Sequence, residues 1–547
     1  MNALLRHLVV LPVVVPLVVG AAMFFLAESS RAARVALATT SLLIQLAVAV
    51  ALLYLTSDAA PYIWTEGVGV YAIGGWPAPY GIVLVVDRLS AVMVTLTAVV
   101  ALSALVYSVA RWDRPGQPYH SLFQFLTMGL NGAFLTGDLF NLFVFFEVLL
   151  AASYGLMLRG GGASRVKLGL HYIAVNLTAS FLFLIGVALI YGMAGTLNMA
   201  DLAGRAAALA PADRALFDAG AAILGVAFLV KAGSWPLNFW LPGTYTIAVA
   251  PVAAVFAMMT KVGLYAVLRL STLMEEYETL GAALFYIGLA TLVSGTIGML
   301  AAKHLARLVA YTVLVSTGIL FATLGLRIEA LTAPVLFYLI VSVITTSMFF
   351  MLTGMTDRTR MTDPPASPED DATPQPLYVA YGIKEPSVHV SGEDVGIAIP
   401  AAMAFIGMVF VCCVLLVTGL PPLPGFLAKL ALLSTALEMG PAAGLTTSTW
   451  LLCAAVLLSG LAGIVALSRV GMRLFWSIAA RTTPRLRLVE VAPVAALVML
   501  SLGLAIVTEP VTRYLESAAR SVHHPDTYVR AVLSHRTRRE QPGAQEP

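Results

Sequence analysis

Charged residues are scarce in this sequence. Only 11% of its 547 residues are Asp, Glu, Lys or Arg, and 59% are hydrophobic, whereas about a quarter of the residues in a soluble domain are charged. The charges are missing from long stretches and crowded into short ones, as expected when apolar helices cross a bilayer and charges mark their connections. The composition excludes a water-soluble globular fold. The formal net charge of +3 gives no reason to expect nucleic acid as a partner.

Cysteine is almost absent. The three cysteines Cys412, Cys413 and Cys453 lie inside apolar runs and form no Cys-x-x-Cys pair. Neither a disulfide framework nor an iron-sulfur or zinc site is supported, and the thiols are interpreted as small apolar side chains. We therefore expect no metal and no cofactor.

Long apolar runs make up most of the chain. Runs of about 17 to 25 residues, bounded by charges or by Gly and Pro clusters, predict an all-α, polytopic membrane protein with about fourteen spans. The first run is long and has no small-residue cleavage site, so it is interpreted as a span and not as a signal peptide. The expected spans cover approximately residues 8–26, 35–55, 82–110, 121–136, 139–158, 168–192, 217–241, 250–272, 280–301, 306–326, 331–354, 398–438, 448–468 and 489–508.

Basic residues are distributed unequally over the two ends of these spans. The connections after odd-numbered spans are rich in Arg and Lys, whereas the short connections after even-numbered spans hold chiefly Arg205, Arg214 and Arg327. The positive-inside bias places the connections after odd-numbered spans in the cytoplasm, and it therefore places both termini on the periplasmic or extracellular side. The basic tail from Arg530 to Arg539 opposes this orientation, but short loops near the spans carry more weight. The basic residues in the connections after odd-numbered spans are Arg31, Arg34, Arg111, Arg114, Arg159, Arg165, Lys167, Lys303, Arg307, Arg469, Arg473, Arg481, Arg485 and Arg487.

Two segments are too polar to lie in a membrane. Residues 356–397 contain an Asp-Pro-Pro run and an acidic Glu-Asp-Asp run, and they predict a polar, mobile insertion on the cytoplasmic side. Residues 512–547 are expected to form a polar, loosely ordered tail.

Glu147 is the first of four charged residues that the pattern places inside spans. An ionisable group in the bilayer costs roughly 2.5 to 3.5 kcal/mol on insertion scales, so a chain retains it for a reason. Glu147 has no neighbouring charge on its own predicted helix, and its partner must come from another helix. The alternative is a protonated, hydrogen-bonded carboxyl with a structural role. Asp138, at the start of the same span, is expected to be a helix cap.

Lys231 and Lys261 occupy the middle of the seventh and eighth expected spans. Pro236 interrupts the helix just after Lys231, which frees backbone carbonyls and makes room for water. A lysine beside a helix break is a candidate ion site, because a nearby carboxylate that moves can switch its protonation. Lys261 could receive a proton from Lys231. The alternatives are a structural salt bridge for Lys231 and a lysine that snorkels to an interface for Lys261.

Lys429 follows a second broken helix, in which Pro421, Pro422 and Pro424 interrupt the twelfth span. The two broken spans are five spans apart, and a repeat with an odd number of spans must place its second copy upside down. Interrupted spans at matching positions of two halves indicate the ion sites of transporters. The predicted organisation is three N-terminal spans, two inverted five-helix repeats that each contain a broken helix, and a last span. These units cover residues 1–120, 121–272, 280–468 and 489–508.

A continuous path between the lysines needs further members. Lys303, His304 and Arg307 begin the tenth span and His171 begins the sixth. Histidine titrates near neutral pH and suits a relay, although residues at helix ends are more often hydrated. Small hydroxyl side chains could hold waters or simply pack between helices; the candidates are Thr178, Ser180, Ser316 and Thr317.

Four motifs carry a resemblance to a known family. They are GDLFNLFVFFEVLLAASY at 137–154, KAGSWPLNFWLP at 231–242, MTKVGLYAVLR at 259–269 and GLPPLPGFLAK at 419–429. These motifs resemble the D-type subunit of Mrp-type multisubunit monovalent cation/proton antiporters, which is related to the antiporter-like subunits of respiratory complex I. The resemblance covers nearly all of residues 80–510. It implies a fourteen-helix fold with two inverted five-helix repeats.

The resemblance also implies roles for single residues. Glu147 is similar to the glutamate paired with the first channel lysine, Lys231, while Lys261 matches the connecting lysine and Lys429 the lysine of the second broken helix. At the tenth span the family pattern Leu-Lys-Arg-Leu-Leu-Ala-Tyr appears as LARLVAY at 305–311. Ala306 therefore replaces a lysine of the central relay. The possible substitutes are Lys303 and His304, and Arg307 is kept.

The function implied by this resemblance is that of a transporter component, not an enzyme, which moves protons to drive cation efflux. The run at 241–245 and the polar insertion look most like the Pha branch, which is associated with potassium/proton exchange, and sodium is the other candidate ion. The expected partners are A/B or fused AB, C, E, F and G type subunits and the lipid of a bacterial inner membrane. The alternative is a proton-pumping membrane subunit of a complex I-like quinone dehydrogenase or a membrane-bound hydrogenase. A passive scaffold is the third interpretation.

Overall fold

The computed structural model describes most of the chain. The described residues are 5, 7–26, 30–60, 64, 67–113, 118–159, 162–273, 278–356, 401–443, 446–475 and 486–534. The predicted polar insertion at 356–397 lies outside the described residues except for Thr356, as do residues 535–547 of the predicted tail.

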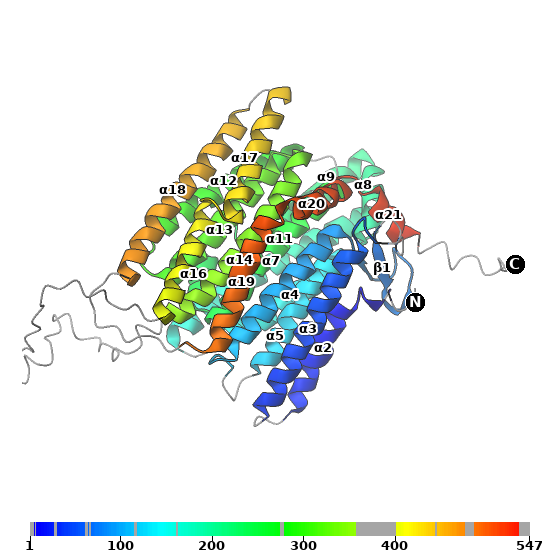
Figure 1. The fold of residues 1–547 in the computed structure, drawn as a ribbon. Coiled ribbons are helices and arrows are strands. Elements are labelled where there is room, and N and C mark those ends of the chain that lie inside the picture. Colours follow the sequence, from blue (N-terminus) through cyan, green and yellow to red (C-terminus); the bar gives the residue numbers. More distant parts are fainter. Residues whose placement is uncertain are drawn as a thin grey trace, which may run out of the picture.

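The described chain is almost entirely helical (Figure 1). Two short strands, β1 (Gly69–Ala72) and β2 (Val83–Val86), pair antiparallel between α3 and α4. The N-terminal helices are α2 (Leu11–Ala22), η1 (Met23–Phe25), α3 (Arg31–Leu55), η2 (Ile73–Gly75) and α4 (Arg88–Ser108). The middle of the chain forms α5 (Tyr119–Leu135), α6 (Leu139–Met157), α7 (Ala163–Ala194), α8 (Met199–Ala207), α9 (Pro211–Lys231), α10 (Trp240–Ile247) and α11 (Ala250–Leu273). The remainder forms α12 (Glu278–Ala301), α13 (Leu305–Gly325), η3 (Glu329–Leu331), α14 (Thr332–Thr356), α16 (Ala401–Thr418), α17 (Pro424–Ala443), α18 (Thr447–Phe475), α19 (Leu488–Ile506), α20 (Thr508–His523) and α21 (Asp526–Leu533).

The protein is a multi-pass membrane protein. Eleven helices of the described chain are long and apolar enough to cross a bilayer. The expected first, fourth and seventh spans correspond to α2, α5 and α9, which are not among these eleven. The total of fourteen spans therefore stays a prediction.

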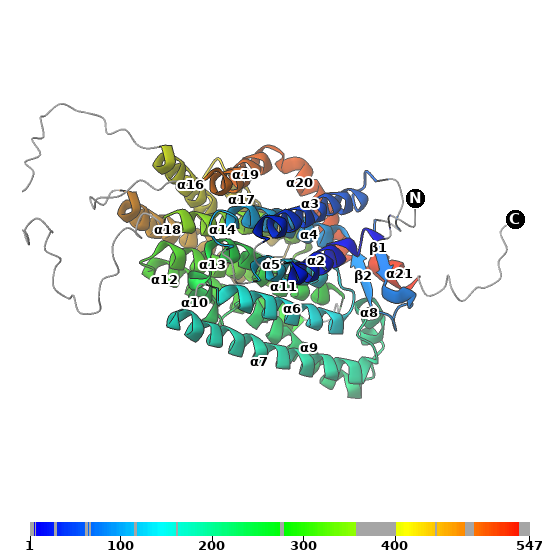
Figure 2. The same ribbon diagram turned by 90° about the horizontal axis from the view of Figure 1, so that it is seen from below.

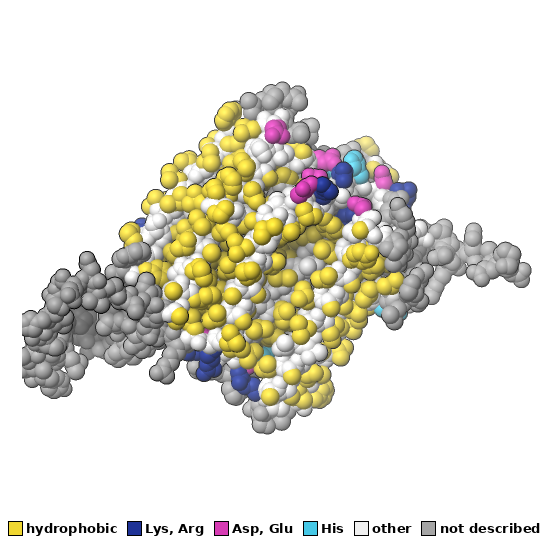
Figure 3. All heavy atoms as spheres, in the orientation of Figure 1, with side chains coloured by type: hydrophobic (Ala, Val, Ile, Leu, Met, Phe, Trp, Pro, Cys, Tyr) yellow, Lys and Arg dark blue, Asp and Glu magenta, His cyan; other side chains and the backbone are white. Residues whose placement is uncertain are grey.

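Three helices form the core of the bundle. In α11, α13 and α14, between 89% and 94% of the most apolar stretch is buried by neighbouring helices. Figure 2 shows α7 and α9 along one edge of the bundle and α3, α19 and α20 along the opposite edge, with α11 and α13 between them. The outer helices turn large apolar side chains outward, among them Phe181 of α7 and Leu457 of α18. The face seen in Figure 3 is correspondingly covered by hydrophobic side chains, as required for contact with lipid tails.

Both predicted helix breaks are present. The seventh span ends its first half at Lys231, and α10 begins at Trp240. The twelfth span breaks between Thr418 and Pro424. A glycine in each break has a positive φ, +73° at Gly233 and +77° at Gly419, a conformation that residues with a Cβ rarely adopt.

The two ends of the bundle differ in charge, as Figure 3 shows. We call the end that carries the connections after α4, α6, α12 and α18 the basic end. It holds Arg111, Arg159, Lys303 and Arg473. The opposite end, which we call the acidic end, holds the connections after α3, α7 and α13 and the helices α20 and α21. Carboxylates occur here together with basic partners, in the pairs Asp58–Arg88, Asp201–Arg205, Asp218–Arg214, Glu329–His524 and Glu509–Arg513.

The predicted loose tail is wrong for the part that the structure describes. Residues 508–533 form α20 and α21, which lie across the acidic end (Figure 1). The inner face of α20 buries Leu515, Ala518 and Val522, while charged residues face outward. Average composition hid this pattern, because an amphipathic helix is polar overall and apolar only along one stripe.

Candidate functional site

The first buried cluster joins Glu147 of α6 to Lys231 of α9. The Ser180 hydroxyl of α7 lies between them: it donates a hydrogen bond to Glu147 and accepts one from Lys231 Nζ at 3.1 Å. The ammonium also lies 4.7 Å from the centroid of the Phe146 ring, which is within the range of a cation–π interaction. Lys231 is 6% exposed. The predicted pairing of these two charges is thus mediated by a hydroxyl.

The helix break places Lys231 in this cluster. Lys231 is the last residue of α9, so it lies directly at the break that was expected just after it. Trp240 Nε1 donates to the Val230 carbonyl at 3.2 Å and thereby satisfies a carbonyl near the end of the helix. The buried Ser234 hydroxyl has no hydrogen-bond partner in the described structure, and a buried polar atom of this kind is a place for a water molecule.

The second cluster surrounds Lys261, in the middle of α11. Lys261 is 2% exposed, and its Nζ donates to Ser316 Oγ at 2.9 Å and to Thr317 Oγ1 at 3.3 Å. Ser316 in turn donates to Ser342 of α14 at 3.1 Å. The ammonium is therefore held by two neutral hydroxyl oxygens of α13, and α14 contacts one of these hydroxyls. The burial excludes the alternative of a lysine that snorkels to an interface.

The third cluster is the break that holds Lys429 of α17. Lys429 Nζ donates to the carbonyls of Val417 and Thr418 at 2.8 and 3.0 Å, and these carbonyls are the ones that the break in the helix frees. The start of α17 lies so close to the end of α16 that a Cβ on Gly425 would come within 2.2 Å of the Leu416 carbonyl oxygen. Only glycine permits this approach. Lys429 lies after its break, whereas Lys231 precedes its own.

The other candidate residues lie apart from these clusters. Lys303, His304 and Arg307 are exposed at the basic end, where α13 begins. They precede Ser316 by nine to thirteen residues of sequence, or roughly 14 to 20 Å along a helix. His171 is exposed and contacts the ring of Phe239.

Three of the four candidate hydroxyls contact a buried lysine, and the predicted helix cap is present. Ser180, Ser316 and Thr317 contact the buried lysines, whereas Thr178 faces outward. Asp138 caps α6 by accepting a hydrogen bond from the Asn141 amide at 2.9 Å, as predicted.

Sequence reasoning missed a buried ion pair between Asp87 and Arg269. Asp87 caps α4, and Arg269 of α11 donates to both of its carboxylate oxygens, at 2.7 and 2.8 Å. Both residues are at most 5% exposed. An arginine inside the apolar run at 250–272 was the available signal. Its partner lies 182 residues away in the sequence.

The amino-acid sequence as a whole matches known proteins. A family model described as the transmembrane part of NADH:quinone oxidoreductase and Mrp antiporters matches residues 136–366. The probable K+/H+ antiporter D subunit of Rhizobium meliloti (strain 1021) is 47% identical, and the match covers 97% of this chain and 98% of that protein. The chain belongs to the family of antiporter D subunits. The Na+/H+ antiporter D subunit of Bacillus subtilis (strain 168) is 32% identical over 97% of this chain and all of its own length.

Chains of two solved membrane complexes have the same fold as this antiporter D subunit. One chain of the Mrp complex from Dietzia sp. DQ12-45-1b superposes with a TM-score of 0.78 at 25% identity, covering 97% of this chain and 99% of that one. One chain of the membrane-bound sulfane sulfur reductase, an archaeal respiratory membrane complex, shares the fold with a TM-score of 0.78 at 24% identity, covering 97% of this chain and all of that one.

Proposed function

We propose that this chain is the proton-translocating subunit of a multisubunit K+/H+ or Na+/H+ antiporter, and not an enzyme. Protons move along Glu147, Lys231, Lys261 and Lys429. The observation that carries the proposal is that three lysines are buried in the bundle, each hydrogen-bonded to hydroxyl or carbonyl oxygens. Burying such charges costs free energy. The related D subunits are named as K+/H+ and Na+/H+ antiporter subunits, and proton transport would explain why this chain retains the charges.

Ser180 gives the first transfer a chemical route. A hydroxyl can accept a proton from one neighbour while it donates its own to another. Its oxygen accepts from Lys231, and its single hydrogen can be donated to Glu147 or to the Asn176 carbonyl 3.1 Å away. A proton can therefore pass between the two charged groups by small movements of one side chain. The ammonium of Lys261 is held by hydroxyls in the same way, which supports a role as the next member.

Lys303, His304 and Arg307 are proposed as a hydrated group at the entrance to this path. Their exposed positions at the start of α13 favour a role at an aqueous mouth over the central position that the resemblance implied. Ser316 and Thr317 take the central position in this proposal because they are the groups that contact Lys261.

The difference in basic residues between the two ends supports one orientation in the membrane. We place the basic end in the cytoplasm of a bacterial cell and the acidic end, with both termini, on the outer side of the inner membrane. The insertion after α14 then leaves the bundle on the cytoplasmic side. In the proposed domain division, two inverted repeats at 121–272 and 280–468 follow the N-terminal helices in 1–120 and precede the last span.

The partners of the chain are proposed to be the other subunits of the antiporter, of types A/B or fused AB, C, E, F and G, together with membrane lipid. The similarity to a chain of the Mrp complex supports an assembled state. We propose that K+ or Na+ crosses the membrane through other subunits, because the three clusters present ammonium groups, which repel cations.

The second candidate is a proton-pumping subunit of a complex I-like dehydrogenase or hydrogenase. Chains of respiratory complex I from Thermus thermophilus share the fold with TM-scores of 0.66 and 0.72 at 20% and 19% identity, covering 93% and 97% of this chain and 99% of each of those chains. The much higher identity to an antiporter subunit over the whole chain favours exchange.

Cation-dependent proton movement in inverted vesicles that contain the whole complex tests the function. We expect Lys231→Ala and Glu147→Gln to abolish exchange at matched assembly. Lys167→Ala and Glu516→Gln are the control variants, because both residues are exposed. Unchanged exchange in Lys231→Ala and Glu147→Gln would reduce the cluster to a structural contact and refute the mechanism.

A further inference from the structure

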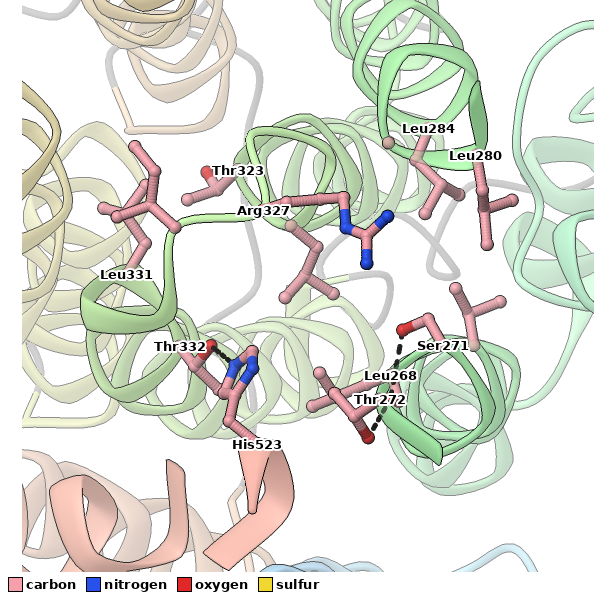
Figure 4. A pocket seen from close by; sticks show the side chains of 14 residues that line it. Leu268, Ser271, Thr272, Leu280, Leu284, Thr323, Arg327, Leu331, Thr332 and His523 are labelled. Carbon is pink, nitrogen blue, oxygen red and sulfur yellow. Dashed lines mark hydrogen bonds between the residues drawn. The ribbon is translucent and has the colours of Figure 1, made fainter. Parts of the chain in front are cut away.

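A cavity of about 360 Å³ opens at the acidic end of the bundle. It lies between the ends of α11 and α13, the starts of α12 and α14 and the end of α20 (Figure 4). Its volume is on the order of ten water molecules at about 30 Å³ each. Its polar lining consists of Ser271, Thr272, Thr323, Arg327, Thr332 and His523.

The cavity is aligned with the Lys261 cluster along two helices. On α11, the lining residue Leu268 follows Lys261 by seven residues. On α13, the lining residue Thr323 follows Ser316 by the same number. Seven residues are almost two full turns, so each pair lies on one helix face about 10.5 Å apart. The cavity therefore lies about two turns from Lys261, on the helix faces that carry the ammonium and its hydroxyl partner.

A thin apolar layer separates the cavity from Lys261. One turn beyond Ser316, α13 carries Ile319 and Leu320, and one turn beyond Lys261, α11 carries Leu264. All three are at most 2% exposed. Apolar constrictions of this kind can gate a water path by wetting and drying. The lining residues Leu268 and Thr323 are about 10.5 Å from Lys261 and Ser316 along their helices, a distance that a short chain of waters can cross.

His523 lies at the mouth of the cavity. Its Nε2 is 2.8 Å from the Thr332 hydroxyl, and Figure 4 shows the two side chains meeting across the gap between α20 and α14. Glu329 of η3, Arg327 after α13 and the adjacent His524 are the charged and titratable groups that face it. Burial lowers the pKa of His523 below its ordinary value of 6.5, while Glu329 opposes this shift. The lowered pKa favours the neutral imidazole, whose ring nitrogens can donate and accept hydrogen bonds where the cavity meets solvent.

We propose that this cavity is the water-filled vestibule through which Lys261 exchanges its proton with the aqueous phase at the acidic end. The inference rests on the proposed proton path and adds a branch to it. In the transfer, the N–H bond of the ammonium breaks and an O–H bond forms on Ser316, which passes its own proton to water. Lys261 becomes a neutral amine and is reloaded from the Lys231 side. Thr323 lines the inner part of the vestibule and His523 its mouth.

Cysteine labelling of the assembled complex in vesicles tests the vestibule. The native Cys412, Cys413 and Cys453 are replaced by alanine, and Ser271→Cys or Thr272→Cys is added. A cationic, membrane-impermeant methanethiosulfonate is applied from the acidic end. We expect both variants to be labelled and exchange to fall after labelling to the level of Lys261→Ala. The control Glu516→Cys, at the same end but outside the cavity, is expected to be labelled without loss.

Ile319→Cys gives a readout that does not depend on activity. It lies in the apolar layer, so we expect it to react much more slowly than Ser271→Cys. Absence of labelling at both Ser271→Cys and Thr272→Cys, or full labelling with exchange unchanged, would overturn the vestibule. If exchange survives labelling but is lost in Lys231→Ala, the vestibule alone fails. If Lys231→Ala and Glu147→Gln also keep full exchange, the proposed function fails with it.

Discussion

Lys231 Nζ donates a 3.1 Å hydrogen bond to Ser180 Oγ, and the same hydroxyl donates to the Glu147 carboxylate. The two charges are therefore coupled through an atom that can reverse its donor and acceptor roles. A direct salt bridge would hold both partners in one charge state. A hydroxyl between them lets the proton leave without separating an ion pair in a medium of low dielectric constant, where separation is expensive.

Replacing Ser180 should slow exchange without unfolding the chain. A hydrogen bond to a charged group contributes about 1.5–3 kcal/mol, so Ser180→Ala is expected to reduce the exchange rate by roughly ten- to a hundredfold. The measurement is the initial rate of proton movement in vesicles after cation addition. Thr178→Val, on the exposed face of the same helix, is the matched control. Equal rates in Ser180→Ala and the native complex would show that the hydroxyl is not part of the path.

Lys429 should have separable roles in structure and transport. Lys429→Met leaves the Val417 and Thr418 carbonyls without their donor, which costs about 1–3 kcal/mol for each buried group. Both thermal stability and exchange should fall. Lys429→Arg keeps a charged donor but cannot release a proton, so it should lose exchange and retain most of the stability. Thermal unfolding of the purified complex, combined with vesicle exchange, checks both variants; full exchange with arginine would contradict a proton-carrying lysine.

The Asp87–Arg269 pair should make a large contribution to stability. Because it is bidentate and buried, Arg269→Met leaves an unpaired carboxylate and is expected to cost about 3–5 kcal/mol. Arg88→Met is the control. Arg88 is paired with Asp58, whose side chain is 75% exposed, and it should cost less than about 1 kcal/mol. Denaturation midpoints of the two variants are the measurement, and equal losses would show that burial of the Asp87 pair has no special effect.

Asp113 links stability to pH at the basic end. Burial raises the pKa of this carboxyl, whereas hydrogen bonds from His120 and Arg31 lower it. The lowering is the larger effect, so the pKa in the folded state lies below 3.8. A lowered pKa in the folded state means that the stabilisation is fully present above pH 3.8 and is lost as the pH falls through the folded pKa.

The lowered pKa of Asp113 in the folded state determines how the effect of Asp113→Asn depends on pH. We expect the substitution to lower the free energy of unfolding by about 1 kcal/mol at neutral pH, since the partner Arg31 is half exposed. The difference in Tm from the native chain should stay constant down to about pH 5 and shrink only near pH 3.8 and below. Asp213→Asn, at an exposed carboxylate, is the control. A difference that disappeared already between about pH 8 and 6 would assign the effect to another group.

The sequence by itself determined the membrane fold, the two helix breaks and the identity of the buried lysines. These features are local. A bilayer requires long apolar runs with internally satisfied backbones. A cluster of Pro and Gly marks a helix break locally, although the single prolines Pro16 and Pro493 lie inside continuous helices. A charge in an apolar run is visible without knowing its neighbours. The same reasoning failed for α20, because its apolar stripe is hidden in a polar average.

Only the tertiary structure decided what each charge contacts. Ser180 lies 51 residues from Lys231, and Ser316 lies 55 residues from Lys261, and which face of each helix meets its neighbour is set by packing. For the same reason, no single stretch of the sequence predicts that Lys303 is exposed at the start of α13. Nor does one predict the cavity between α11, α13 and α20. The sequence supplies the charged groups, and the rotation and contact of separate helices determine the hydroxyls and carbonyls through which they act.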